Sequence, residues 1–325
     1  MAYGMLSFTG QDIESKSWQV LLQLFNLVGI VILNRGNCGL SKCVTRYLLA
    51  MSTADLLVVI LNVLLDRINN LYFPVTFLSI TPVCALRVVL YVAALSCSVW
   101  FTVTFTFDRF VAVCCQKLRT RYCNTRTAFV LLVSVSVGSF LRSIIWYFVL
   151  TPSIVIDNVP WFCVTKSDYH TSLFWKVYVW INVIMISLLP FVLILAFNAL
   201  TVRNIIRANH IRCRLRIHGN EQNNTDPEVV QRRKSIILLF ALSANFMLLW
   251  TPFIVRALIW REENYNYKDK TLNGPIFVFQ EIGFMLRLLS SCTNTCIYAL
   301  TQTKFRQELI NGAKYLFTRI VKLCK

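Results

Sequence analysis

Charged residues are scarce in this chain of 325 residues, and acidic residues are scarcer than basic ones. Only 15% of the residues are charged, with 15 Asp and Glu against 33 Lys and Arg, whereas 56% are hydrophobic. A soluble domain of this length cannot bury so much apolar surface. The three histidines (170, 210 and 218) lie in or beside polar stretches that separate the apolar runs. Neither a metal cluster nor a catalytic triad is therefore expected, and we predict a membrane protein that is not an enzyme.

Long apolar runs occur seven times, at residues 18–33, 47–65, 88–107, 128–150, 173–200, 235–260 and 276–300. Runs of about 18 or more apolar residues are typical of transmembrane helices, and the alternating ten-residue segments of a membrane β-barrel do not occur. We expect an all-α membrane protein with a single domain over residues 1–325. Its seven transmembrane helices are predicted at about 18–34, 47–66, 84–115, 127–150, 172–204, 232–260 and 275–301.

The first run is the weakest of the seven, because only about sixteen apolar residues precede the following loop, against the roughly twenty that a span needs. Two explanations remain open. The first helix continues outward past Lys16, or the chain is a truncated product that has lost part of that helix.

Most Lys and Arg residues fall between the first and second, third and fourth, and fifth and sixth runs, or in the tail from Lys304 onward. Cytoplasmic loops are enriched in basic residues, so these segments are predicted to face the cytoplasm and the N-terminus to lie outside the cell, in the plasma membrane. No cleavable signal peptide is expected before the first run. The net charge of +18 thus indicates an inner membrane face that attracts anionic lipids, and not a nucleic-acid surface.

Twelve cysteines are present, but only Cys84 and Cys163 fall in segments predicted to be extracellular. An oxidising exterior favours their pairing, which would tie the loop between the fourth and fifth spans to the start of the third. The other ten are predicted to stay reduced. We therefore expect one disulfide bond, between Cys84 and Cys163.

Polar and proline residues inside the apolar runs are functional candidates, because ionisable groups at membrane depth are costly. They include Asn26, Asp55, Pro190, the WTP stretch that contains Trp250 and Pro252, and the NTCIY stretch from Asn294 to Tyr298. The sequence FTFDRFVAVCC places Asp108 and Arg109 at the end of the third run. This set, in this order and spacing, resembles the rhodopsin-like (class A) G-protein-coupled receptors over essentially the whole chain.

Within that class, YLLAMSTADLLVV, the LWTP variant and the NTCIYALTQTKFR ending resemble the orphan-type group of probable G-protein coupled receptors 139 and 142. Asn198, where most class A receptors have Tyr, is similar to that group too. The resemblance implies a receptor that passes an extracellular signal, from a small molecule or a peptide, to a heterotrimeric G protein. It associates the group with aromatic amino acids as ligands and with coupling through the Gq class.

The resemblance implies three groups of working residues. A switch at the G-protein end would comprise Asp108, Arg109, Asn198, Asn294 and Tyr298. A transmission region below the ligand would comprise Val99, Pro190, Phe246, Trp250 and Pro252. A sodium site would comprise Asp55, Ser98, Ser290 and Asn294, with the alternative that Asp55 is protonated and bonded to neighbouring amides. No other cofactor is expected.

The Asp108–Arg109 pair is predicted to be a two-state element, in which Arg109 exchanges Asp108 for the G protein when the sixth span moves outward. Many class A receptors add an acidic residue at the start of the sixth span, but here that region has the sequence VVQRRKS. An acidic lock is therefore not expected, and appreciable basal activity is predicted.

The resemblance also implies a ligand pocket that contains Arg87, Tyr91, Leu95, Phe253, Arg256 and Arg287. Its arginines could bind a carboxylate or phosphate in a bidentate manner. Alternatively, they pair with acidic residues such as Glu281 and Asp66, or extend to the membrane surface. Tyr91 stands where amine receptors have an Asp, so a monoamine ligand is disfavoured.

The stretch 303–324 alternates apolar and basic residues, so we expect an amphipathic helix at about 303–318 on the inner leaflet. Cys324 is a candidate palmitoylation site, with a free thiol as the alternative. A transporter or channel is disfavoured, because the sequence has no internal repeat and Asp55 is the one carboxylate deep within a span. A receptor paralogue that no longer signals remains an alternative.

Overall fold

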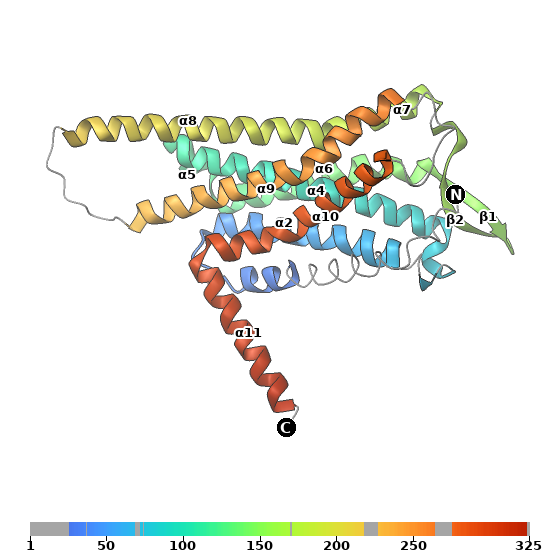
Figure 1. The fold of residues 1–325 in the computed structure, drawn as a ribbon, viewed down its shortest axis with the longest axis horizontal. Helices are drawn as coiled ribbons and strands as arrows, with labels where there is room; N and C mark the ends of the chain where they lie inside the picture. The colour runs from blue at the N-terminus through green and yellow to red at the C-terminus, as the bar shows by residue number, and fades with distance from the viewer. Residues whose placement is uncertain are drawn as a thin grey trace.

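Helices lying side by side along one axis make up most of the computed structural model (Figure 1), which describes residues 26–36, 38–68, 72–73, 75–169, 171–217, 227–263 and 275–323. Residues 26–34 form the described part of the first helix. Five of the other six spans contain one α-helix each: α2 (Lys42–Val59), α4 (Thr81–Cys114), α6 (Thr125–Ser143), α9 (Pro227–Glu263) and α10 (Pro275–Thr301). The fifth span contains two, α7 (Leu173–Val183) and α8 (Leu189–Ile217). The predicted seven-helix bundle is confirmed.

Three of the spans change helical type along their length. A π-helix over Ile60–Ile68 continues α2, another over Ile184–Leu188 joins α7 to α8, and a 3-10 segment over Ile144–Val149 continues α6. Polar side chains cap the first turns of two helices. At the start of α2 the Ser41 hydroxyl accepts from the Val44 amide, and at the start of α6 the Asn124 side chain accepts from the Thr127 amide at 2.8 Å. Such caps satisfy amides that the first helical turn leaves without partners.

Two elements at the ends of the bundle were not predicted from the sequence. The loop after the fourth span forms a hairpin of β1 (Leu150–Ile156) and β2 (Val159–Thr165), and α5 (Gln116–Tyr122) follows α4. We call the end that carries the hairpin the hairpin end, and the opposite end, which carries α5, the α5 end. At the α5 end α11 (Thr303–Leu323) leaves the bundle and points away from it (Figure 1). It is five residues longer than predicted, and α8 extends thirteen residues beyond the predicted end at 204.

Large apolar side chains cover the outside of the bundle as well as filling its core. Leu248 is 73% exposed and Leu300 is 78% exposed. Among the described residues, five helical segments are long and apolar enough to cross a membrane: Lys42–Asp66, Thr81–Cys114, Thr125–Val149, Leu173–Ala208 and Arg233–Val255. An apolar exterior of this kind suits lipid and not water.

The π-helix between α7 and α8 leaves a backbone carbonyl that its own chain cannot satisfy. The Leu189 amide donates to the Ile184 carbonyl five residues back. In the same register the Met185 carbonyl would accept from residue 190, but Pro190 has no N–H. The indole of Trp100, on α4, donates to the Met185 carbonyl at 3.0 Å instead. Trp100 therefore supplies the hydrogen bond that Pro190 cannot, and it ties α4 to the bend.

Candidate functional site

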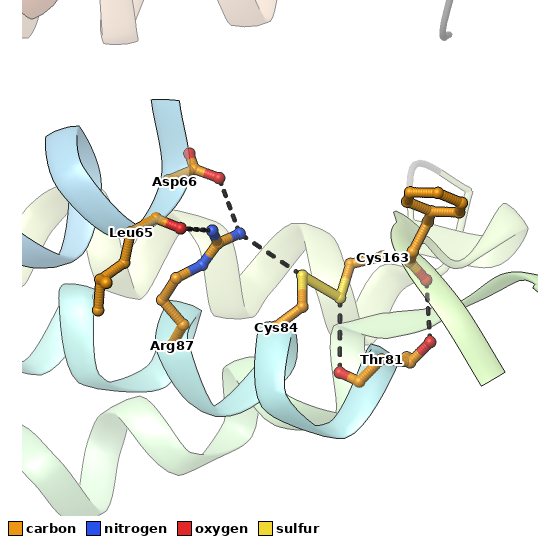
Figure 2. Close-up of a disulfide and its surroundings, with 7 residues drawn as sticks. Leu65, Asp66, Thr81, Cys84, Arg87 and Cys163 are labelled. Atoms are coloured by element: carbon orange, nitrogen blue, oxygen red, sulfur yellow. Dashed lines mark hydrogen bonds and ion pairs between the residues drawn. A yellow bond between two sulfur atoms is a disulfide. The ribbon is translucent and has the colours of Figure 1, made fainter. Parts of the chain in front are cut away.

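A disulfide bond joins the hairpin to the start of α4, as the sequence predicts. Cys84 and Cys163 are bonded, and the Thr81 hydroxyl donates to the Phe162 carbonyl at 2.9 Å. Figure 2 shows Arg87, one turn further along α4, turned toward the π-helix that follows α2. Its guanidinium donates to the Leu65 carbonyl and pairs with the Asp66 carboxylate at 2.7 Å. Arg87 is thus held by an acidic residue of the chain, which is the alternative that the sequence left open.

Arg287, on α10, lies buried in the bundle with its charge against aromatic rings. Its Nη2 donates to the Tyr91 hydroxyl at 2.7 Å, and its guanidinium carbon lies 4.4 Å from the centre of the Phe253 ring and 5.1 Å from that of Phe284. Arg287 is only 7% exposed, and its Nε has no hydrogen-bond partner among the described atoms. None of the acidic side chains that the structure describes pairs with it. The predicted pocket residues Tyr91, Phe253 and Arg287 are therefore together, and Leu95 lies buried in the same core.

Arg256, the remaining predicted pocket residue, and Glu281 have side chains outside the described part of the structure. Gly283, on α10, packs directly against α9 in this region. A Cβ at Gly283 would lie 3.3 Å from backbone atoms of Phe253, so the two helices approach closely beside the Arg287 cluster.

Asp55 lies fully buried at the centre of a polar cluster between α2, α4 and α10. The Ser98 hydroxyl donates to its Oδ1 at 2.5 Å and the Asn294 amide donates to its Oδ2 at 2.7 Å. The Ser291 side chain, also on α10, lies beside this carboxylate. Ser290, which the sequence placed in this ring, instead contacts Asn245 of α9. The correction follows from the helix: residues one position apart point about 100° apart, so only one of the two serines can face Asp55.

A carboxylate oxygen of Asp55 and the hydroxyl oxygen of Ser98 thus meet at one point, while the Asn294 amide faces the carboxylate with its nitrogen. Carboxylate and hydroxyl oxygens suit a hard cation such as sodium. Among the described residues, no group of three His, Cys, Asp or Glu side chains is placed to hold a metal ion. The first helix closes the cluster, since Asn26 donates to the Ser291 carbonyl at 2.9 Å.

Three of the predicted transmission residues, Val99, Phe246 and Trp250, pack into one buried core. The rings of Phe246 and Trp250 stack with their centres 5.0 Å apart, and Trp250 meets the Phe253 ring edge-on at 5.9 Å. Val99 is buried in the same core, and Pro252 lies within α9. A continuous series of rings therefore connects the Arg287 cluster with the centre of α9.

At the α5 end, Arg109 has two partners on two helices. Its Nε and Nη2 donate to the Asp108 carboxylate, and its Nη1 donates to the hydroxyl of Ser235, on α9, at 3.1 Å. Asp108 is 5% exposed and Arg109 is 8% exposed, so the two charges neutralise each other in a buried position. On α9, Arg109 thus contacts a neutral hydroxyl and not an acidic side chain. The sequence prediction missed this partner. Only the adjacency of Ser235 to the RRK stretch could have drawn attention to it.

Asn198 and Tyr298 are buried at the same end, but neither contacts Arg109 through a hydrogen bond that the structure describes. The Asn198 amide donates to the Ile194 carbonyl at 2.8 Å, within its own helix. The Tyr298 ring meets Phe305 of α11 edge-on at 5.9 Å, and its hydroxyl has no partner among the described atoms. A buried hydroxyl without a partner is costly.

Cys123 directly follows α5, outside the spans. Burial raises the pKa of the Cys123 thiol to about 12, with the Asp108 carboxylate acting in the same direction. Cys324, the candidate lipidation site, lies outside the described residues.

Arg142 is a half-buried arginine with a role that the sequence did not explain. Arg142, on α6, donates to the Asn182 side chain and to the Ser96 hydroxyl, each at 2.7 Å. The Tyr178 hydroxyl donates to the Arg142 carbonyl at 3.0 Å. Arg142 therefore joins α4, α6 and α7 through neutral partners.

The sequence model of one protein family, described as 7 transmembrane receptor (rhodopsin family), matches residues 26–298. The match covers most of the chain and contains the Asp55, Arg109, Trp250 and Arg287 clusters. Proteins of this family are receptors and not enzymes, and they act between an extracellular ligand and a G protein. The chain is therefore a multi-pass membrane receptor of the rhodopsin family, a G-protein-coupled receptor.

Proposed function

We propose that this receptor responds to a small ligand that carries a carboxylate and an aromatic group, with aromatic amino acids as the leading candidates. The ligand binds between Tyr91, Phe253 and Arg287, and the α5 end activates a G protein of the Gq class. The excess of basic residues in the segments at the α5 end supports a plasma-membrane orientation with the N-terminus and the hairpin outside.

The observation that carries this proposal is the buried charge of Arg287 without an acidic partner in the described structure. A buried charge is stable when it is paired or fully hydrogen-bonded, and a guanidinium can bind a carboxylate through two parallel N–H donors. The unpartnered Nε of Arg287 and its Nη2 are adjacent donors of that fork. The rings of Phe253 and Phe284 beside it favour an aromatic ligand group.

Contacts along α9 connect the proposed ligand site with Arg109. Phe253 contacts Trp250, which stacks on Phe246 in the same helix, and α9 carries Ser235 at its other end. We propose that a ligand-induced shift of α9 separates Ser235 from Arg109. Arg109 then contacts the G protein, and Asn198 and Tyr298 close around the opened end.

The proposal also assigns sodium to the Asp55 cluster. Asp55 would supply the charge and the hydroxyl oxygens of Ser98 and Ser291 would complete the coordination, with the Asn294 amide bonded to the Asp55 carboxylate. An ion between α2, α4 and α10 would hold these helices in the resting arrangement.

The test is calcium release in cells that express the receptor at matched surface levels, with phenylalanine or tryptophan added. The Arg287→Gln variant should lose the response at ligand concentrations that saturate the unchanged receptor, and Tyr91→Phe should shift the response to higher concentrations. The Lys176→Gln variant is the matched control, because it removes an exposed cation at the same end and should respond normally.

Arg109→Ala separates ligand binding from coupling, because it should abolish calcium release while leaving ligand binding intact. An unchanged response of Arg287→Gln would refute the assignment of the ligand site. A response that persists in the Arg109→Ala variant would refute the switch.

A further inference from the structure

Arg142 places a positive charge within the apolar span of α6, and the structure describes no acid that balances it. Its side chain is half-buried, and its Nη1 and Nη2 donate to the Asn182 side chain and to the Ser96 hydroxyl. Both acceptors are neutral, and none of the acidic side chains in the described part of the chain pairs with Arg142. A charge within a membrane is costly unless a partner offsets it, so Arg142 is a candidate binding site for an anion.

The neutral partners of Arg142 are themselves held in place. The Asn182 amide donates to the Tyr178 carbonyl at 2.9 Å, and the Tyr178 hydroxyl donates to the Arg142 carbonyl at 3.0 Å. The Ser96 hydroxyl lies 3.0 Å from that of Ser139, which precedes Arg142 by one turn of α6. The guanidinium is therefore oriented before any ligand binds, and its two bonds leave further N–H donors of the fork for that ligand.

The surface of α6 beside Arg142 is bare. The side chain of a helical residue lies over the turn that precedes it, which here contains Gly138 and Ser139. Ser139 is buried and contacts α4, whereas Gly138 is exposed. No described atom of a neighbouring element lies within 4 Å of the position that a Cβ at Gly138 would take, and the adjacent side chain of Leu141 is exposed. An acyl chain can therefore lie against α6 at Gly138 with its polar end at Arg142.

Arg142 lies toward the hairpin end, just below the level expected for lipid headgroups. Trp146 and Tyr147 follow it by about one turn, and the Trp146 ring packs on that of Tyr178 with the centres 5.8 Å apart. Trp and Tyr gather where the hydrocarbon layer meets the headgroups, so Arg142 lies about one turn deeper. The phosphate of a diacyl lipid stays in the headgroup layer, whereas the carboxylate of a fatty acid has no further group attached and can reach this depth. One carboxylate also matches the single charge of Arg142 and accepts two parallel N–H bonds.

We propose that Arg142 and the bare surface at Gly138 form a binding site for a long-chain fatty acid from the leaflet at the hairpin end. The carboxylate pairs with the guanidinium of Arg142, and the acyl chain lies along α6 over Gly138 and Leu141, toward the middle of the membrane. This site faces the lipid and differs from the cluster around Arg287, on α10. It is a second ligand site, and it does not depend on the function proposed above.

The test is photolabelling of the purified full-length receptor in nanodiscs of phosphatidylcholine, which has no net charge. The probe is palmitic acid with a diazirine in the middle of its chain, and mass spectrometry of receptor peptides locates the label. The competitors are oleic acid, oleyl alcohol, which has the same chain without the charge, and oleoyl lysophosphatidic acid, which has a phosphate. We expect label within Thr125–Val149, displacement by oleic acid, no displacement by oleyl alcohol and weaker displacement by the phosphate.

Two variants test the two parts of the site. Arg142→Gln should lower labelling of this segment by at least about tenfold below saturation, because hydrogen bonds to a charged group contribute roughly that factor. Gly138→Leu fills the bare surface but leaves the bonds of Arg142 intact, so it should lower labelling without disturbing the contacts between helices. Val130→Leu, at an exposed position of the same helix, and Arg287→Gln, which removes a different arginine, are the controls and should label like the unchanged receptor.

Labelling of Gly138→Leu at the unchanged level would overturn the proposal, and so would the absence of label from Thr125–Val149. Equal competition by oleyl alcohol and oleic acid would also overturn it, because the chain alone would then suffice. Stronger competition by lysophosphatidic acid would assign the site to a phosphate instead. Loss of labelling in Arg287→Gln would place the fatty acid in the pocket of the proposed function. A missing calcium response to aromatic amino acids refutes only that function, because photolabelling requires no signalling.

Discussion

Replacing Trp100 by Phe should destabilise the receptor through one backbone carbonyl. The substitution removes the indole N–H that donates to the Met185 carbonyl at 3.0 Å, and Pro190 cannot replace it. A buried polar group left without its partner costs about 1–3 kcal/mol, whereas hydrogen bonds between membrane helices average about 0.6 kcal/mol. We therefore expect a loss of about 1 kcal/mol for the hydrogen bond alone, which lowers the melting temperature by roughly 2 °C in a protein of this size.

The chain provides a matched control for the loss of packing that any Trp to Phe change causes. The indole nitrogen of Trp146 is buried and has no hydrogen-bond partner among the described atoms. Trp146→Phe removes the same atoms without breaking such a bond, so the difference between the two variants isolates the bond to Met185. Thermal unfolding of the purified variants in detergent, followed by a thiol-reactive dye, measures it. Equal melting temperatures for the two variants would refute the role assigned to Trp100.

Three further predictions test other parts of the structure. Gly29→Ala should lower the free energy of unfolding by about 1–3 kcal/mol, because the new Cβ would lie 2.5 Å from the Thr295 hydroxyl oxygen. Gly138→Ala is the control, since no atom lies within 4 Å of its new Cβ, and it should not be destabilised. Equal melting temperatures for the two variants would contradict this packing. Asp55→Asn should remove the stabilisation that sodium chloride gives over choline chloride, and the idea fails if the sodium effect survives in thermal unfolding. Because a pKa of about 12 leaves about one thiol in ten thousand ionised at pH 8, Cys123 should react with iodoacetamide far more slowly than a free cysteine peptide, as mass spectrometry can measure; equal rates would contradict its burial.

The sequence predicted the spans well because a membrane imposes a simple rule. Every backbone group in the hydrocarbon layer must be satisfied internally, so long apolar runs form helices, and α10 begins and ends where the sequence placed it. The hairpin and α5 lie outside that layer, where the rule has no force, and neither was predicted. The Cys84–Cys163 bond followed from the topology, since no other cysteine was predicted on that side.

The candidate site was predictable as a set of residues but not as a set of contacts. Asp55 and Arg109 were identified because ionisable groups at membrane depth are rare, and Arg287 was identified through the resemblance to the receptor family. Which serine faces Asp55 depends on the rotation of α10, which hydropathy does not define. That Ser235 meets Arg109 depends on how α9 crosses α4, and the two residues are 126 positions apart in the chain.

The sequence by itself determined the class of the protein, because length, hydropathy and the spacing of a few polar residues suffice for a bundle of seven helices. Only the tertiary structure decided which charges are paired. In the structure, Arg87 pairs with Asp66, and Arg109 contacts both Asp108 and Ser235. Arg287 instead lies among aromatic rings. The physical reason is that electrostatic and hydrogen-bonding partners are chosen by distances of a few ångströms between different helices. Such distances are set by side-chain packing across the bundle and not by the order of residues within any one span.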